Sequence, residues 1–220
     1  MSVYDFEHMR RSMVASQLRT TGVADARVLA AVGEVPRERF VPEARAAGAY
    51  ADAAVPLGGG RELSPPMATA RLLSEAGPRG QERAMVVGAA TGYSAALLDR
   101  LCASTVAVEE DSALVDFARG ALAGTRVELV EGPLAQGHSE GAPYDLILID
   151  GAVEAVPEAI VAQLAEGGRL AAAIVERGVT RLGIGRKASG GFGFTIFTDA
   201  AAAVLPGFAR PRSFSFERAE

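Results

Sequence analysis

The stretch that most constrains the fold is Met85–Leu98, where a short apolar run meets a glycine-bearing turn and continues into a helix-forming run. This is the pattern of a buried parallel strand that passes through a tight turn into a crossover helix. A second apolar strand, Thr105–Glu109, follows and ends in an acid. An acid about 20 residues past the glycines can accept hydrogen bonds from both hydroxyls of a ribose. The pair predicts a site for a nucleoside-containing cofactor, with Gly88 and Gly92 in the turn and Glu109 on the ribose.

The turn itself selects among nucleoside cofactors. From Gly88 the chain reads Gly-Ala-Ala-Thr-Gly-Tyr, which lacks the second glycine of a dinucleotide-binding turn and has its last glycine one place early. The Gly-Lys-Ser/Thr ending of a phosphate-binding loop is absent. Methyltransferases that use S-adenosylmethionine have a closely related glycine turn, an acid closing the second strand and, often, an antiparallel strand pair at the end. The spacing and the Phe-rich tail therefore favour S-adenosylmethionine over NAD.

After Gly80 the sequence alternates between short apolar strands and helices, which is typical of a parallel sheet with right-handed crossovers. The expected strands are Arg83–Val87, Thr105–Glu109, Arg126–Val130, Tyr144–Asp150 and Arg169–Val175, and the expected helices are Tyr93–Ala103, Ser112–Leu122 and Pro157–Leu164. The end of the chain differs, because its strands are joined by Gly/Ser or Pro-bearing loops. We expect antiparallel strands there, at Arg181–Arg186, Phe192–Thr198 and Ser213–Phe216.

Before Gly80 the sequence predicts helices and turns. An amphipathic helix is expected over Asp5–Leu18, and Asp25 is placed to cap a second helix, Ala26–Val32, that ends at Gly33. A helical turn at Glu43–Ala47 and a helix over Met67–Ala76 complete the expected helices. Val55–Pro66 is rich in Gly and Pro and is interpreted as a flexible, exposed loop. We expect one compact domain over 1–220, with a helical extension over 1–79 and an α/β core over 80–220.

Composition excludes several function classes. The net charge is −5 and no block of Lys or Arg occurs, so a nucleic-acid binder is not expected. The single cysteine, Cys102, rules out an internal disulfide framework; it lies in an apolar helix, is expected to be buried, and favours a cytoplasmic location. Met1–Arg19 lacks an apolar signal core, so neither a signal peptide nor a membrane span is expected. His8 and His138 are far apart, so we expect no metal site.

The first two-thirds of the chain resembles the protein-L-isoaspartate (D-aspartate) O-methyltransferase family. Its marks before the glycine turn are specific, because ordinary class I methyltransferases lack them. The matching residues are Gln17-Leu18-Arg19, Val28-Leu29, Val35-Pro36-Arg37-Glu38, Phe40-Val41-Pro42, Ala49-Tyr50, Asp52, Pro56-Leu57-Gly58, Leu63-Ser64, Pro66, Gly92-Tyr93, Ala95-Ala96, Val108-Glu109, Ala142-Pro143-Tyr144-Asp145, Gln163-Leu164 and Gly167-Gly168.

The resemblance implies a fold, an activity and roles for particular residues. The fold is a Rossmann-like class I S-adenosylmethionine-dependent methyltransferase, with a mostly parallel sheet, antiparallel C-terminal edge strands and an N-terminal helical extension. The activity is methyl transfer to the free carboxylate of isoaspartyl residues in damaged proteins or peptides, a repair reaction. Ser64 falls on the family's active-site serine, Glu109 on its ribose acid and Glu131 on an acid near the adenine. We expect no nucleic-acid or membrane partner, and a monomer is favoured.

Several residues depart from the family pattern. Val86 replaces an acid that holds the amino group of the cofactor's methionine end, and Ala90 replaces a turn glycine. Losing the acid removes about 1.5–3 kcal/mol of hydrogen bonding; a left-handed Ala90 costs about 1–2 kcal/mol. Asp150, which replaces a threonine, lies where it could partly compensate, so Gly88, Ala90, Gly92, Glu109, Glu131 and Asp150 form the predicted cofactor site.

The serine loop departs as well, because Arg61, Glu62 and Pro65 replace glutamine, threonine and glutamine. Two alternatives therefore stay open. One is a catalytically silent binding protein on the methyltransferase fold, and the other is a methyltransferase with a different substrate.

Overall fold

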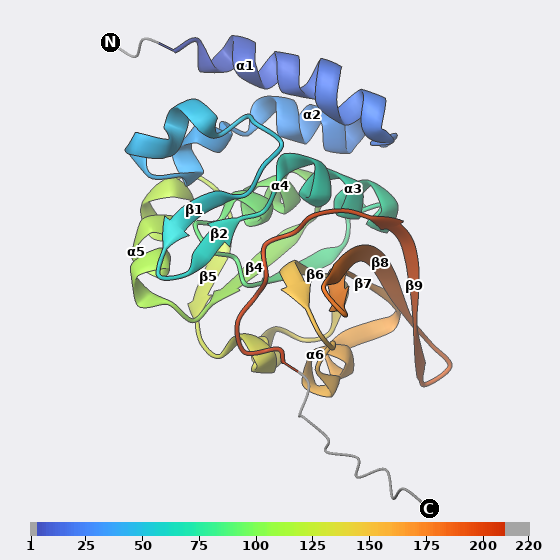
Figure 1. The fold of residues 1–220 in the computed structure, drawn as a ribbon. Helices are drawn as coiled ribbons and strands as arrows, with labels where there is room; N and C mark the ends of the chain where they lie inside the picture. The colour runs from blue at the N-terminus through green and yellow to red at the C-terminus, as the bar shows by residue number, and fades with distance from the viewer. Residues whose placement is uncertain (1–3, 210–220) are drawn as a thin grey trace, which may run out of the picture.

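The structure, a computed structural model, describes residues 4–209. In this part of the chain an N-terminal group of helices packs on a helix-covered sheet (Figure 1). The α-helices are α1 (Phe6–Met13), α2 (Ala26–Glu34), α3 (Pro66–Ala76), α4 (Tyr93–Leu101), α5 (Ser112–Ala121) and α6 (Glu158–Ala162). The strands are β1 (Val55–Gly58), β2 (Arg61–Leu63), β3 (Arg83–Val87), β4 (Ser104–Glu109), β5 (Glu128–Glu131), β6 (Tyr144–Val153), β7 (Leu164–Glu176), β8 (Val179–Ala188) and β9 (Gly191–Asp199).

Seven of these strands form one sheet in the order β5-β4-β3-β6-β7-β8-β9. The neighbours from β5 to β7 run parallel, and β8 and β9 extend the sheet with antiparallel pairings. This is the predicted mostly parallel sheet with antiparallel edge strands. The third expected antiparallel strand, Ser213–Phe216, lies outside the described residues.

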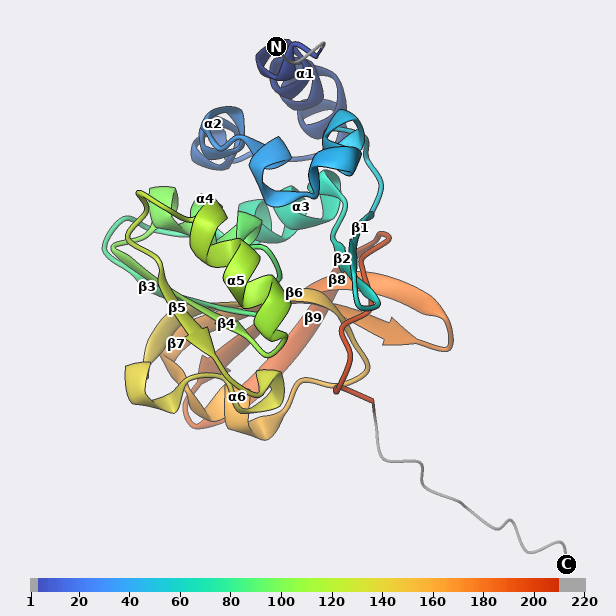
Figure 2. The same cartoon turned by 90° about the vertical axis from the view of Figure 1, so that its left-hand side faces the viewer.

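The parallel strands are apolar without alternation because both of their faces are covered. On β3, Val86 packs with the N-terminal helices and with α3 and α4, whereas Met85 and Val87 pack with the cluster that includes Ile160 of α6. Figure 2 shows α1 and α2 stacked outside α3 and α4, on the side of the sheet opposite α6. The second face is covered more thinly, by α6 and by the segment that carries Leu205.

The N-terminal helices form where predicted, with one difference in length. Asp5 caps α1 by accepting the amide of His8, and the helix continues in π and 3₁₀ turns until Gly22, whose φ is +89°. Asp25 caps α2 as predicted. The predicted end at Gly33 is wrong, because α2 continues to Glu34. A glycine is tolerated inside a helix, and the chain leaves the helix only where Pro36 forces the residue before it into an extended conformation.

The prediction of a flexible, exposed loop over Val55–Pro66 is wrong. The segment forms an antiparallel hairpin of β1 and β2, and the buried residues of β2 alternate with the exposed Glu62. Its turn is exposed, but Arg61, Leu63 and the loop residue Ser64 are buried. The glycines that indicated a flexible loop are the ones that a hairpin turn needs. The residues that bury the strand lie elsewhere in the chain, so the local composition does not reveal its burial.

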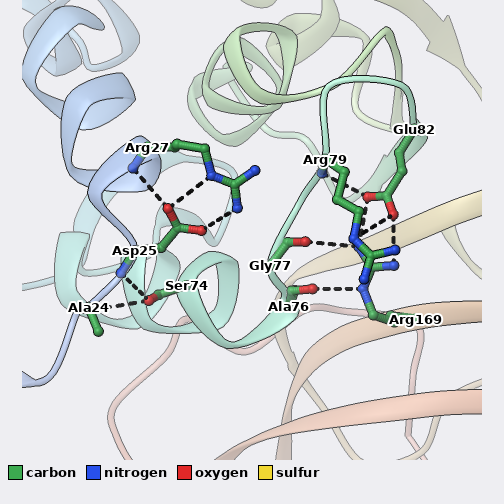
Figure 3. A network of polar contacts seen from close by, with 9 residues as sticks. All are labelled: Ala24, Asp25, Arg27, Ser74, Ala76, Gly77, Arg79, Glu82 and Arg169. Atoms are coloured by element: carbon green, nitrogen blue, oxygen red, sulfur yellow. Dashed lines mark hydrogen bonds and ion pairs between the residues drawn. The ribbon is translucent and has the colours of Figure 1, made fainter.

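A buried ion pair joins β7 to the segment just before β3, and its arginine also binds the end of α3 (Figure 3). Arg169 of β7 donates two hydrogen bonds to Glu82, at 2.9 and 2.7 Å, and one to the carbonyl of Ala76 at 2.7 Å. Both side chains are 7 % exposed. The arginine thus ties the C-terminal end of α3 to β7 and to the segment before β3.

Candidate functional site

The strand order reverses between β3 and β6, because β3 pairs with β4 on one side and with β6 on the other; the region at the carboxyl ends of these strands is called the crevice below. Open α/β sheets bind ligands at such a switch point. The turn after β3 is left-handed at three places, with φ of +77° at Gly88, +49° at Ala90 and +97° at Gly92. Ala90 therefore has the strained conformation that the sequence left as a possibility, at a cost of about 1–2 kcal/mol.

Glu109 ends β4 beside this turn and is fully buried. Its carboxylate accepts the amide of Ala90 at 2.7 Å and the amides of Glu110 and Asp111 at 2.9 and 3.1 Å. It also forms a two-point ion pair with Arg61 of β2, at 2.6 Å to Oε1 and 2.9 Å to Oε2. A guanidinium presents two parallel donors to a carboxylate, as a vicinal diol does. Both oxygens of the predicted ribose acid are thus occupied by an arginine of the same chain, and its role toward a ribose stays a prediction.

Glu131 lies directly beside Glu109, because the two residues are paired in register across β4 and β5. Its side chain is exposed. The structure thus brings both predicted acids to one edge of the sheet, one buried and one open to solvent.

Asp150 lies near the carboxyl end of β6 and is almost completely buried. Burial raises the pKa of the Asp150 carboxyl, while hydrogen bonding from Ser94, the charges of Arg37 and Arg61, and hydrogen bonding from Ser64 oppose that rise. The predicted catalytic Ser64 and the predicted compensating Asp150 therefore face each other.

Ser64 is fixed by the N-terminal part of the chain. Its carbonyl accepts a hydrogen bond from Arg37 at 2.6 Å, and the same guanidinium donates to the carbonyl of Ala49 at 2.8 Å. Arg37 is fully buried and stacks over the ring of Tyr93, 4.7 Å from its centroid. Burial lowers the pKa of Arg37, and the neighbouring polar groups counter that effect. The serine loop is thus attached at its backbone to a buried cation, and the Ser64 hydroxyl hydrogen-bonds Asp150.

The segment after β9 crosses the same crevice. The amide of Ala152 donates to the carbonyl of Ala203 at 2.6 Å, and the amide of Leu205 donates to the carbonyl of Ala152 at 2.9 Å. Figure 1 shows this segment, in dark red, descending between the β1–β2 hairpin and the end of β6. A β-carbon on Gly88 would lie 2.7 Å from Cδ1 of Leu205. The leucine side chain therefore fills the space directly over the first turn glycine.

The types of donor and acceptor in this region suit an adenosyl cofactor once Arg61 has left Glu109 and Leu205 has left Gly88. The turn has the left-handed backbone that lets amides approach a ligand closely, and the Glu109 carboxylate binds a group with two donors, the guanidinium of Arg61. The groups that occupy this space are two side chains, Leu205 over Gly88 and Arg61 on Glu109. Glu109, Glu131, the turn residues and Asp150 are the groups that would hold such a cofactor.

Three residues of this site were missed by the sequence reasoning as functional groups: Arg37, Arg61 and Ser94. Arg37 belongs to Val35–Glu38, one of the segments that match the family. That match indicated a role for Arg37 beyond forming a turn. Arg61 was noted only as a departure. Ser94 looked like an ordinary residue in the first turn of a helix, and only the position of Asp150 reveals its contact.

Two absences hold for residues 4–209. No group of three or more His, Cys, Asp or Glu residues in this part of the chain is arranged to hold a metal ion. No helix there is both long enough and apolar enough to cross a membrane.

The strand order, the left-handed turn and the buried acid after β4 define a Rossmann-like fold of the class I S-adenosylmethionine-dependent methyltransferases. The model of the protein-L-isoaspartate(D-aspartate) O-methyltransferase family matches residues 9–196. The chain belongs to that family.

Relatives and solved structures agree with this assignment. A protein-L-isoaspartate O-methyltransferase of Methylorubrum populi is 44% identical over 163 residues, 73% of this chain and 77% of the relative. One of Methanoculleus marisnigri is 39% identical over 76% of this chain and 78% of the relative. A solved protein-L-isoaspartate O-methyltransferase has a TM-score of 0.78 at 25% identity, covering 90% of this chain and 66% of its own. A Plasmodium falciparum structure in complex with S-adenosyl-L-homocysteine shares the fold, with a TM-score of 0.77 at 20% identity over 89% of this chain and 97% of that one.

Proposed function

We propose that this chain transfers a methyl group from S-adenosylmethionine to the free carboxylate of isoaspartyl residues in damaged proteins or peptides. The observation that carries the proposal is the meeting of Ser64, Asp150 and Glu109 at the carboxyl ends of β3, β4 and β6. Membership of the isoaspartyl methyltransferase family supports the substrate class.

The proposed reaction requires little acid–base catalysis from the protein. S-adenosylmethionine supplies an electrophilic methyl group on a sulfonium. The acceptor carboxylate is already ionised near neutral pH, so its oxygen can form the new O–C bond while the C–S bond breaks and the electron pair stays on sulfur. No proton has to be removed. The protein's task is to orient the acceptor and exclude water. Asp150, whose pKa burial raises, is therefore not required as a base.

Ser64 is the group that we assign to orientation. Its backbone is fixed by Arg37, the residue is only 4 % exposed, and its hydroxyl hydrogen-bonds Asp150. A hydroxyl has one proton to donate, so Ser64 donates to the incoming carboxylate in place of Asp150, from a position that its backbone already fixes. In the same proposal Glu109 holds the ribose, Glu131 lies near the adenine, and Asp150 faces the amino end of the cofactor.

The remaining parts of the proposal concern partners and location. We infer isoaspartyl proteins as the macromolecular partners, no nucleic-acid partner, a monomer and a cytoplasmic location. The net charge of −5 without a basic block supports the second point, and the single buried cysteine supports the last.

The test is calorimetric titration with S-adenosylmethionine and S-adenosylhomocysteine, followed by methyl transfer to an isoaspartyl peptide and to its aspartyl counterpart. We expect binding of both nucleosides and transfer to the isoaspartyl peptide alone. Ser64→Ala is expected to lower kcat about ten- to a hundredfold, the value of one hydrogen bond to a charged group, with little change in cofactor affinity. Ser139→Ala, an exposed serine, is the control. Equal losses in kcat and in cofactor affinity would make Ser64 structural.

A second candidate is a catalytically silent binding protein on the same fold. The specific observation that favours it is the filling of the crevice by the chain itself, with Leu205 over Gly88 and Arg61 on Glu109. No heat of binding at millimolar nucleoside would select this candidate. Binding of cofactor together with transfer to some other acceptor would select a methyltransferase with a different substrate.

A further inference from the structure

Arg61 is paired with the carboxylate of Glu109, the group to which a ribose would bind in the proposed function. The side chains of Arg61 and Glu109 are 6 % and 0 % exposed. Together with the amides of Ala90, Glu110 and Asp111, the guanidinium gives Glu109 five donors, whereas a carboxylate offers about four lone-pair sites. A ribose diol cannot be added to this set. Arg61 has to leave Glu109 before the diol can bind there.

The hairpin that carries Arg61 has the means to release it. The turn Gly58–Gly60 has φ of +101°, +58° and +77° and is exposed throughout. No atom outside the turn approaches the α-carbons of Gly58 or Gly60 closely enough to touch an added β-carbon. Three successive glycines leave this turn free to change its backbone angles. The Arg61 end of β2, next to this turn, can therefore shift while Leu63 at the other end of the strand keeps its place in the core.

A second anion can pair with the guanidinium of Arg61 when it leaves Glu109. Arg61 lies three residues before Ser64 on the same chain segment, and its charge acts on Asp150 as well as on Glu109. Arg61 therefore stands between the ribose end of the crevice and the end where Ser64 faces it. A buried guanidinium that loses its carboxylate is strongly unfavourable unless another anion replaces the first. The acceptor of the proposed reaction is itself a carboxylate.

We propose that Arg61 is the residue that couples cofactor and acceptor binding, pairing with Glu109 when the crevice holds no nucleoside and with the acceptor's carboxylate when the ribose has taken Glu109. The inference rests on the proposed function. It assigns a substrate-binding role to a residue that replaces an uncharged glutamine of the family pattern. The cofactor and the isoaspartyl carboxylate then strengthen each other's binding, because each relieves a charge that the other would leave unpaired.

The test measures S-adenosylhomocysteine binding by calorimetry with and without a saturating isoaspartyl peptide, in the natural chain and in Arg61→Gln. In the natural chain we expect the peptide to tighten nucleoside binding about tenfold. In Arg61→Gln we expect the nucleoside alone to bind about tenfold more tightly, the peptide to have no further effect, and the KM for peptide to rise. Glu62→Gln, on the exposed face of the same strand, should behave as the natural chain does.

Arg61→Lys keeps the charge but loses the two-point grip, and it is expected to lie between the other two variants. It also guards against misfolding of the glutamine variant, which thermal unfolding would reveal. Nucleoside binding whose affinity and peptide effect are the same in the natural chain and in both Arg61 variants would overturn the inference and leave the proposed function intact. Nucleoside binding by none of the variants would contradict the proposed function itself, and the inference with it.

Discussion

The side chain of Leu205 lies against the α-carbon of Gly88, so close that a β-carbon there would be 2.7 Å from Cδ1 of the leucine. Leu205 is 5 % exposed and comes from the segment that pairs with the end of β6. A glycine at a positive φ, which has no β-carbon, lets the backbone approach a ligand or another side chain closely. Here the last described part of the chain takes the space over Gly88.

The first prediction follows from this contact. Leu205→Ala should tighten S-adenosylhomocysteine binding about ten- to a hundredfold, because displacing a buried leucine costs about 1.5–3 kcal/mol that the ligand must otherwise supply. Val204→Ala is the matched control, since the neighbouring valine is 64 % exposed. Calorimetric titration of both variants measures the effect. An unchanged affinity in Leu205→Ala would mean that the nucleoside binds without displacing the segment.

The second prediction concerns the strained turn. Ala90→Gly should raise the free energy of unfolding by about 1–2 kcal/mol, because the left-handed conformation at φ +49° costs a glycine nothing. Ala89→Gly, one residue earlier and without a positive φ, should instead lower stability by about 0.5–1 kcal/mol. Urea unfolding of the two variants provides the comparison. Opposite signs are expected, and equal losses would show that the methyl group of Ala90 contributes packing that outweighs its strain.

The third prediction separates two roles of Asp150. Burial raises the pKa of this carboxyl in the folded state above its ordinary value of 3.8. A raised folded-state pKa contributes stability that is complete below 3.8 and is lost as the pH rises through the folded-state value. Asp150→Asn should remove that loss, so its stability should change less with pH than that of the natural chain. Urea unfolding over a pH series measures this.

Cofactor binding by the same variant tests the compensation hypothesis. If Asp150 replaces the missing acid at Val86, Asp150→Asn should weaken nucleoside binding about ten- to a hundredfold. An affinity equal to that of the natural chain would remove Asp150 from the cofactor site while leaving its contact with Ser94 as a structural one.

The fourth prediction concerns the buried pair at the base of the sheet. Arg169→Met should destabilise the fold by about 3–5 kcal/mol, because it leaves the Glu82 carboxylate buried without its cation. Arg119→Met removes an exposed pair with Asp116 and should change stability little. The free energy of unfolding in urea measures both. A small loss in Arg169→Met would show that Glu82 becomes hydrated or protonated at little cost.

The contribution of this pair depends on pH. Burial alone would raise the pKa of Glu82, but the hydrogen bonds and charge of Arg169 outweigh it and hold the pKa below its ordinary value of 4.5. A lowered folded-state pKa contributes stability that is present above 4.5 and is lost as the pH falls through the folded-state value. The difference between the natural chain and Arg169→Met should therefore shrink in acid.

The parallel core could be predicted from sequence because its signals are local. Arg83–Val87 forms the predicted strand, and the predicted helix starts at Tyr93 and Ser112 are confirmed. Apolar runs, a positive-φ glycine and a capping aspartate each act within a few residues. Cys102 is also buried as predicted.

The site was harder to predict because its decisive contacts are distant in sequence. Arg61 is buried against Glu109, which is 48 residues away in the sequence. The Gly-rich sequence around Arg61 does not indicate this partner. Ser94 and Asp150 are 56 residues apart. Leu205 comes from a part of the chain whose composition resembled a simple tail. The types of the site residues were legible, but which of them hold one another was decided by the tertiary structure.

The burial of Cys102 also offers an experimental handle. It is the one cysteine in the sequence, and burial raises its pKa to about 12, so almost none of it is the reactive thiolate at neutral pH. A thiol introduced by Val204→Cys, on an exposed position beside Leu205, would therefore react with a maleimide dye against a silent background. Site-specific labelling therefore requires no removal of a native cysteine. The fluorescence of a dye at position 204 would report movement of the segment that carries Leu205 over the glycine turn in real time.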